Sequence, residues 1–117
     1  MRLPCWGVDE RAERWAENES LFRAVNELIE DTASAAGVDE HLYEFICECA
    51  DPHCHLLLPL TVWQYEQIRA DPTLFLLAPG HERSEIESVV AREGGYQVVR
   101  KLDEAGEYAA QRDPRRL

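Results

Sequence analysis

Three cysteines lie within eight residues of one another near the middle of the chain, in the pattern Cys47-x-Cys49-x4-Cys54. Thiolate sulfurs are among the preferred ligands of zinc, which takes four tetrahedral ligands in structural sites. Cys47 and Cys49 are two positions apart, so on a strand both side chains point to the same face, and Cys54 returns across a turn. The pattern lacks the doubled Cys-x-x-Cys of a zinc ribbon. It still predicts a zinc site with these three cysteines as ligands.

The sequence alone leaves the fourth ligand open. We favour His81, because it follows Pro79-Gly80 after an apolar segment, where a loop can direct its side chain toward a neighbouring hairpin. His53 lies within the turn between the cysteines, and His55 adjoins Cys54 on the opposite strand face. The complete set of candidates is His81, His53, His55, Cys5 and His41.

Other interpretations of the cysteines compete with a metal site. Three thiols on one sheet face can simply pack in the core as small apolar groups. A disulfide between Cys49 and Cys54 is compatible with the turn, although a reducing compartment disfavours it. Such thiols can also serve as a redox sensor, with or without zinc.

The charge of the chain narrows the classes of partner. Its 117 residues carry 23 acidic and 12 basic side chains, for a net charge of −11. The first sixty residues hold 13 of the acids and 4 of the bases. Such a field repels phosphate backbones, so a protein partner is expected rather than a nucleic acid. Without a membrane-spanning or signal-like apolar run, we expect a cytoplasmic protein that does not enter a membrane.

Apolar residues at helical spacing predict an amphipathic helix over residues 11–31 that buries its apolar face and exposes its acids. These apolar residues are Trp15, Leu21, Phe22, Val25, Leu28 and Ile29. The following alternation predicts an antiparallel hairpin over residues 42–49 and 54–60, with the cysteines at its closed end.

Two capping-box patterns predict short helices, Thr61 with Gln64 opening one through Ala70, and Ser84 with Glu87 opening another that ends at Gly94-Gly95. Apolar runs predict strands near 73–78 and 96–102, and Asp103 is expected to cap a terminal helix. The class is therefore α+β, with a small, mostly antiparallel sheet packed against a long N-terminal helix and two or three short helices. We expect one domain over 1–117, with flexible ends at 1–10 and 112–117.

Four segments resemble a family of small bacterial proteins. They are Glu19–Glu27, Phe45–Cys49 with Cys54, Tyr65–Pro72, and Pro79–Glu82. The similarity covers about residues 13–102 and implies Cys47, Cys49, Cys54 and His81 as the shared ligand set. It implies no activity, because the family has none established, and Cys5 falls outside the matched region.

The function favoured by these observations is a non-enzymatic zinc protein that binds a protein partner, with the metal in a structural role. An enzyme with an open zinc position is the alternative, and Glu48 or Glu82 would then be its general base. No His-Glu-x-x-His, phosphate-binding glycine loop or Gly-x-Ser-x-Gly pattern supports catalysis.

Overall fold

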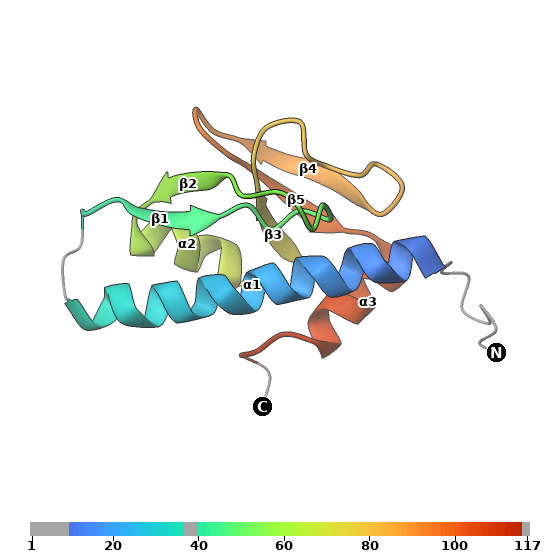
Figure 1. The fold of residues 1–117 in the computed structure, drawn as a ribbon, viewed down its shortest axis with the longest axis horizontal. Helices are drawn as coiled ribbons and strands as arrows, with labels where there is room; N and C mark the ends of the chain where they lie inside the picture. Colours follow the sequence, from blue (N-terminus) through green and yellow to red (C-terminus); the bar gives the residue numbers. More distant parts are fainter. Residues whose placement is uncertain (1–9, 37–39, 116–117) are drawn as a thin grey trace.

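The computed structural model describes residues 10–36 and 40–115, which form three helices and five short strands (Figure 1). The helices are α1 (Glu10–Ala36), α2 (Val62–Arg69) and α3 (Asp103–Gln111). The strands are β1 (Tyr43–Ile46), β2 (Leu57–Leu60), β3 (Leu74–Leu77), β4 (Glu87–Arg92) and β5 (Gln97–Lys101). The predicted α+β class, with one long N-terminal helix and small antiparallel sheets, is confirmed.

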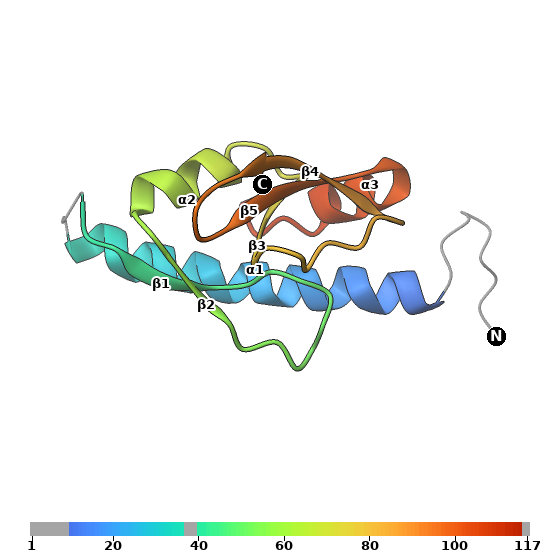
Figure 2. The same ribbon diagram turned by 90° about the horizontal axis from the view of Figure 1, so that it is seen from above.

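The strands form two antiparallel sheets instead of one. β1 and β2 make the predicted hairpin, in which Phe45 lies opposite Leu58. The other sheet has the order β3-β5-β4, and Val99 at its centre lies opposite Phe75 on one side and Val89 on the other. In Figure 1 both sheets lie above α1, which extends along most of the length of the domain, as it does in the view from above in Figure 2. The ligand-bearing segments lie where the two sheets approach each other.

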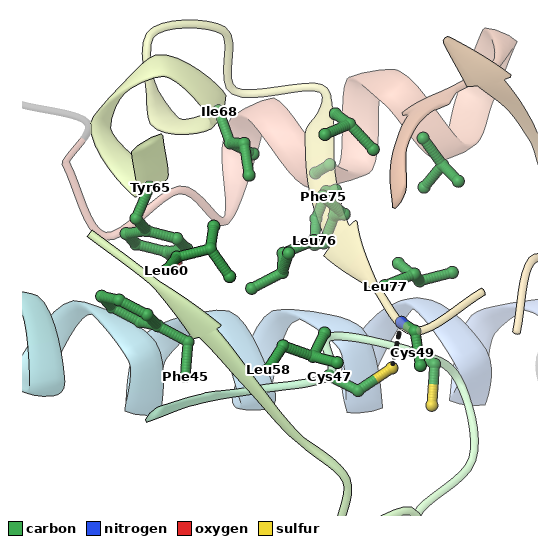
Figure 3. Close-up of a cluster of buried hydrophobic side chains, with 14 residues drawn as sticks. Phe45, Cys47, Cys49, Leu58, Leu60, Tyr65, Ile68, Phe75, Leu76 and Leu77 are labelled. Atoms are coloured by element: carbon green, nitrogen blue, oxygen red, sulfur yellow. Dashed lines mark hydrogen bonds between the residues drawn. The ribbon is translucent and has the colours of Figure 1, made fainter. Parts of the chain in front are cut away.

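The core fills the space between the two sheets, α1 and α2. The rings of Phe45 and Tyr65 stack with their centroids 4.5 Å apart, and Leu60 and Leu76 are fully buried beside them. Cys47 and Cys49 belong to the same buried cluster. Figure 3 shows their sulfurs at one end of it, so the site closes one end of the core.

The helix predicted from Thr61 to Ala70 is confirmed as α2. The Thr61 hydroxyl accepts a hydrogen bond from the Gln64 N–H at 3.1 Å, and the Gln64 side chain accepts one from the Thr61 N–H at 2.8 Å. This reciprocal pair satisfies two donors at the start of the helix. The terminal helix α3 is also present, but its cap is Leu102 and not Asp103, which has a positive φ of 49°.

The helix predicted to begin at Ser84 is wrong, because this segment forms a turn followed by the strand β4. Val89 pairs with Val99 of β5, and β-branched residues are favoured on a paired strand. Glu87 does not act as a helix cap, and its buried carboxylate forms an ion pair with Lys101. Tertiary pairing therefore outweighed a local capping signal.

The predicted orientation of α1 is also largely wrong. Leu21, Val25 and Leu28 are exposed, and only Ile29 of the predicted face packs on the core. The side chains that α1 buries are polar or charged, namely Glu19, Arg23, Asn26 and Glu30, together with the small Ala33. Buried polar groups need partners. The partners are Lys101 for Glu19, backbone carbonyls for Arg23, Glu48 for Asn26 and the Ser34 hydroxyl for Glu30.

The segment after α3 contacts the rest of the domain through ion pairs. Asp113 pairs with Arg69 of α2, and Arg115 pairs with Glu27 of α1 and Glu66 of α2. None of the helices in residues 10–36 and 40–115 has the length and apolar character needed to cross a membrane.

Candidate metal centre

The structure brings together the side chains of Cys47, Cys49, Cys54 and His81. Their ligand atoms all lie within 4.8 Å of one another, and Nδ1 of His81 is 3.7 Å from the sulfurs of both Cys47 and Cys54. A tetrahedral zinc with Zn–S bonds of about 2.3 Å and Zn–N bonds of about 2.0–2.1 Å separates sulfur from nitrogen by about 3.6 Å. The two sulfur–nitrogen separations match this edge, and the four residues are compatible with a metal ion between them.

Cys47 and Cys49 are held by the short segment that continues from β1 alongside β3. Glu48 between them donates its N–H to the Leu76 carbonyl at 2.7 Å, and its carboxylate accepts the Leu76 N–H at 2.9 Å. Because Glu48 faces β3 and the core, the two cysteines on either side of it converge away from it. Both thiols are almost completely buried.

Cys54 returns to the cluster through a turn that begins at Asp51. The Asp51 carbonyl accepts the Cys54 N–H at 3.1 Å, and the Asp51 carboxylate accepts the His53 N–H at 2.8 Å. Aspartate followed by proline favours such a turn, because the carboxylate satisfies a nearby backbone donor. Beyond the turn, Leu56 accepts the N–H of Cys47 at 3.1 Å and closes the loop.

His81 is placed by a tight turn after β3. The Ala78 carbonyl accepts the His81 N–H at 3.1 Å, and Gly80 between them has a φ of +84°. Proline followed by a glycine with positive φ is the preferred sequence of a type II turn. The N–H of Ala78 itself donates to the Cys47 sulfur at 3.1 Å, the contact dashed in Figure 3. Both ends of the turn therefore touch the cluster.

The sulfur of Cys47 accepts the backbone N–H of Ala78 at 3.1 Å. The backbone N–H groups of Asp51 and Leu56 lower the pKa of Cys49 and of Cys54, respectively. Hydrogen bonds of this kind stabilise the thiolate, which is the form that binds a metal. The arrangement therefore suits negatively charged sulfurs in a buried position.

The thiols also influence one another. The hydrogen bond from the Cys47 thiol lowers the pKa of Cys49 to about 5, while the same bond and burial raise the pKa of Cys47. Burial raises the pKa of Cys54. One thiolate is thus favoured at neutral pH, and a bound divalent cation supplies the positive charge needed to hold all three.

The other predicted fourth ligands do not reach this cluster within the described residues. His53 and His55 are exposed, and His41 is exposed with its ring against Tyr43, 4.4 Å between centroids. Cys5 lies outside the described residues. Cys47, Cys49 and Cys54 are free thiols, without the alternative disulfide.

Comparisons with protein-family models, curated proteins and solved structures found no match to this chain. The site is therefore assigned from the geometry and chemistry of its four side chains.

A network of buried hydrogen bonds holds the segment that carries Cys47 and Cys49. The sequence pattern did not predict this network. Glu48 is fully buried, and its carboxylate accepts hydrogen bonds from the Tyr65 hydroxyl at 2.6 Å and from the Asn26 amide at 2.8 Å. Asn26 also accepts the Ile46 N–H and donates to the Ile46 carbonyl, both at 2.8 Å. Burial raises the pKa of Glu48. This network fixes the segment from which Cys47 and Cys49 project.

Proposed function

We propose that this chain is a small, non-enzymatic zinc-binding protein in which the metal has a structural role and the domain serves as a protein-interaction or regulatory module. The observation that carries this proposal is the convergence of three cysteines and His81, from separate segments, with all their ligand atoms within 4.8 Å of one another. Zinc is the proposed metal because a Cys3His ligand set combines thiolates with imidazole and suits its preferences.

A structural role is favoured over catalysis because four protein ligands fill a tetrahedron and leave no position for water or substrate. Both carboxylates considered as general bases are engaged elsewhere. Glu48 accepts its three hydrogen bonds in the core, and Glu82 accepts one from the Gln97 amide at 2.5 Å. The metal would join the segment after β1, which belongs to the hairpin, to the loop after β3, which belongs to the other sheet.

A protein partner in the cytoplasm is the proposed setting. The net charge of −11 supports a protein over a nucleic acid as the partner, since it repels phosphate. A bacterial origin is proposed only from the resemblance of the four sequence segments named above to small bacterial proteins.

Elemental analysis of the purified full chain tests the ligand set. We expect one zinc per chain in the wild type, and a large loss of zinc in His81→Ala, because it removes one of four ligands. His55→Ala is the matched control, since it removes an exposed histidine beside Cys54. Cys5→Ala removes the only other cysteine among the candidates for the fourth ligand. Full zinc in His81→Ala together with loss in either control would show that the assignment is wrong.

Metal removal tests the structural role. A strong chelator should unfold the domain cooperatively, because a site that exists only in the folded chain contributes its binding free energy to folding. Retention of the native circular dichroism spectrum and thermal transition after complete zinc removal would contradict this role.

A zinc–thiolate redox sensor is the competing function, because Cys54 is less buried than the other two thiols. In a sensor, hydrogen peroxide would oxidise two thiolates to a disulfide and would itself be reduced to water. Loss of these two ligands would release the zinc. Release at micromolar peroxide within minutes would favour the sensor, and slow release would favour the structural site.

A further inference from the structure

The outer face of α1 carries an apolar stripe, formed by Leu21, Val25 and Leu28, which we call the outer stripe. Leu21 is 59% exposed, Val25 37% and Leu28 68%. Their spacing of four and three residues places them in one row over about two helical turns. Isolated exposed apolar side chains are common, but a contiguous row indicates a binding surface.

The opposite face of α1 is fixed to the domain by polar contacts, so the outer stripe cannot turn inward. Arg23 donates to the carbonyls of Pro72 at 2.6 Å and Ala109 at 2.7 Å, and its guanidinium lies 4.2 Å from the centre of the Phe75 ring. Three further hydrogen bonds join Asn26 to Ile46 and to the Glu48 carboxylate. Rotation of α1 would leave these buried groups unpaired, which is strongly unfavourable.

Acidic residues lie just beyond both ends of the outer stripe. Glu17 is four residues before Leu21, Asp31 is three residues after Leu28, and both carboxylates are exposed. Each is therefore a helical neighbour of a leucine at one end of the row. At 1.5 Å per residue they are about 21 Å apart along the helix. The surface is an apolar row with a negative charge at each end.

We propose that the outer stripe docks an amphipathic helix of a protein partner, which contributes apolar side chains over about two turns and a basic residue opposite each of Glu17 and Asp31. This proposal rests on the interaction role proposed above and names the chemistry of the partner. Helices pack in this way when apolar rows meet and opposite charges flank them. The two charges fix the position of the partner along α1 as well as adding attraction.

A second copy of this chain fits the surface poorly. In an antiparallel pair centred near Val25, Leu21 would lie close to Leu28 of the other copy, and Glu17 would then lie close to its Asp31. In a parallel pair each acid would face its own counterpart. Like charges at such positions are destabilising, and each copy also carries a net charge of −11. Charge complementarity therefore selects a basic partner helix.

The test uses the zinc-loaded full chain and two synthetic helical peptides of about 20 residues. Both peptides carry the same leucine row, and they differ only at two flanking positions 14 residues apart, which hold lysine in one and glutamate in the other. Fluorescence anisotropy measures the dissociation constants at low and at physiological salt. We expect the lysine peptide to bind at least about tenfold more tightly, with a difference that shrinks as salt screens the charges.

Variants of the chain then locate the binding surface. The double variant L21Q/L28Q should weaken binding of the lysine peptide at least about tenfold. L42Q/L57Q is the matched control, because it makes the same substitution at two exposed leucines of the hairpin region, and it should bind like the wild type. E17K/D31K should reverse the preference and bind the glutamate peptide more tightly.

Binding that is absent, equal for the two peptides, or unchanged in L21Q/L28Q would overturn the proposal. Self-association in sedimentation experiments that L21Q/L28Q abolishes would overturn it too, by showing that a second copy occupies the stripe. Zinc content and helical circular dichroism are measured on every variant. A chain that binds the lysine peptide but holds no zinc would refute the metal proposal alone. A zinc-loaded chain that does not bind the peptide would refute the docking proposal alone.

Discussion

Replacement of Gly80 by alanine should weaken the metal site through the backbone alone. Gly80 has a φ of +84°, and a Cβ added there meets no atom within 4 Å. The substitution therefore creates no clash, and its cost is that of a left-handed backbone in an L-residue, about 1–2 kcal/mol. The turn that bears this strain carries His81 at its end and donates an N–H to Cys47 at its start.

Because 1.4 kcal/mol corresponds to a tenfold change, this cost amounts to about a 5- to 30-fold loss. The loss will fall on zinc affinity if the turn forms only when the metal binds, and on the free energy of unfolding if it is already formed without metal. Competition with a chromophoric zinc chelator measures the zinc affinity, and urea denaturation of the zinc-loaded chain measures the free energy of unfolding.

Gly94→Ala is the matched control. A Cβ at Gly94 also meets no atom within 4 Å, and its φ is outside the left-handed range. Both substitutions reduce the freedom of the unfolded chain alike, so their difference isolates the strain. Equal zinc affinity and equal stability in the two variants would refute the assignment of the turn. A D-alanine at position 80, introduced by chemical ligation, should restore the wild-type values, since it favours positive φ.

Three further substitutions test the supporting structure. Asn26→Ala should destabilise the domain by about 2–4 kcal/mol, because it removes hydrogen bonds to the Glu48 carboxylate and to the backbone of β1. Urea denaturation measures this loss, and a loss under about 1 kcal/mol would contradict the buried network. Thr61→Ala should cost about 1 kcal/mol by removing the cap of α2, and an unchanged thermal midpoint would count against that cap. Burial raises the pKa of Glu19 from 4.5 to about 8, so the folded chain retains a proton that the unfolded chain loses, and stability should decrease as pH rises from about 5 to 8. Glu19→Gln should flatten this slope, and parallel pH profiles of the two zinc-loaded proteins would disprove the effect.

The parts of the site that depend on local sequence could be predicted. Cys47 and Cys49 are two positions apart on the segment that follows β1, and the Asp51-Pro52 turn returns Cys54 to them. The Pro79-Gly80 pair favours a turn, and this turn delivers His81. The helix predicted from Ser84 is instead a turn that leads into β4, so that part of the prediction was wrong.

The polar face of α1 could not be predicted, because its partners are distant in the sequence. Arg23 bonds to the carbonyl of Ala109, 86 residues away, and Asn26 bonds to Glu48, 22 residues away. A periodicity argument assigns the apolar row to the interior because burial of apolar area is the usual driving force. In this chain the fixed contacts of the polar row decide the orientation, and the apolar row is exposed.

The strand β4 could not be predicted either, because it too depends on residues outside its own segment. Ser84 and Glu87 have the spacing of a capping box, and the carboxylate of Glu87 does accept a nearby backbone N–H, from Arg83 at 2.7 Å. The strand forms because β5 offers it a paired edge and because Lys101 on β5 supplies a buried cation for Glu87. A pattern of a few neighbouring residues shows neither the pairing with β5 nor the ion pair with Lys101.

Lys101 is the only lysine in the chain, and it is 4% exposed, enclosed by the carboxylates of Glu19 and Glu87. Reagents that acylate amines will therefore find no exposed lysine among the residues that the structure describes. Acylation of Lys101 requires α1 to separate from β4 and β5, so the rate of acylation, followed by mass spectrometry, measures how often they separate. The single lysine thus reports an internal opening of the domain.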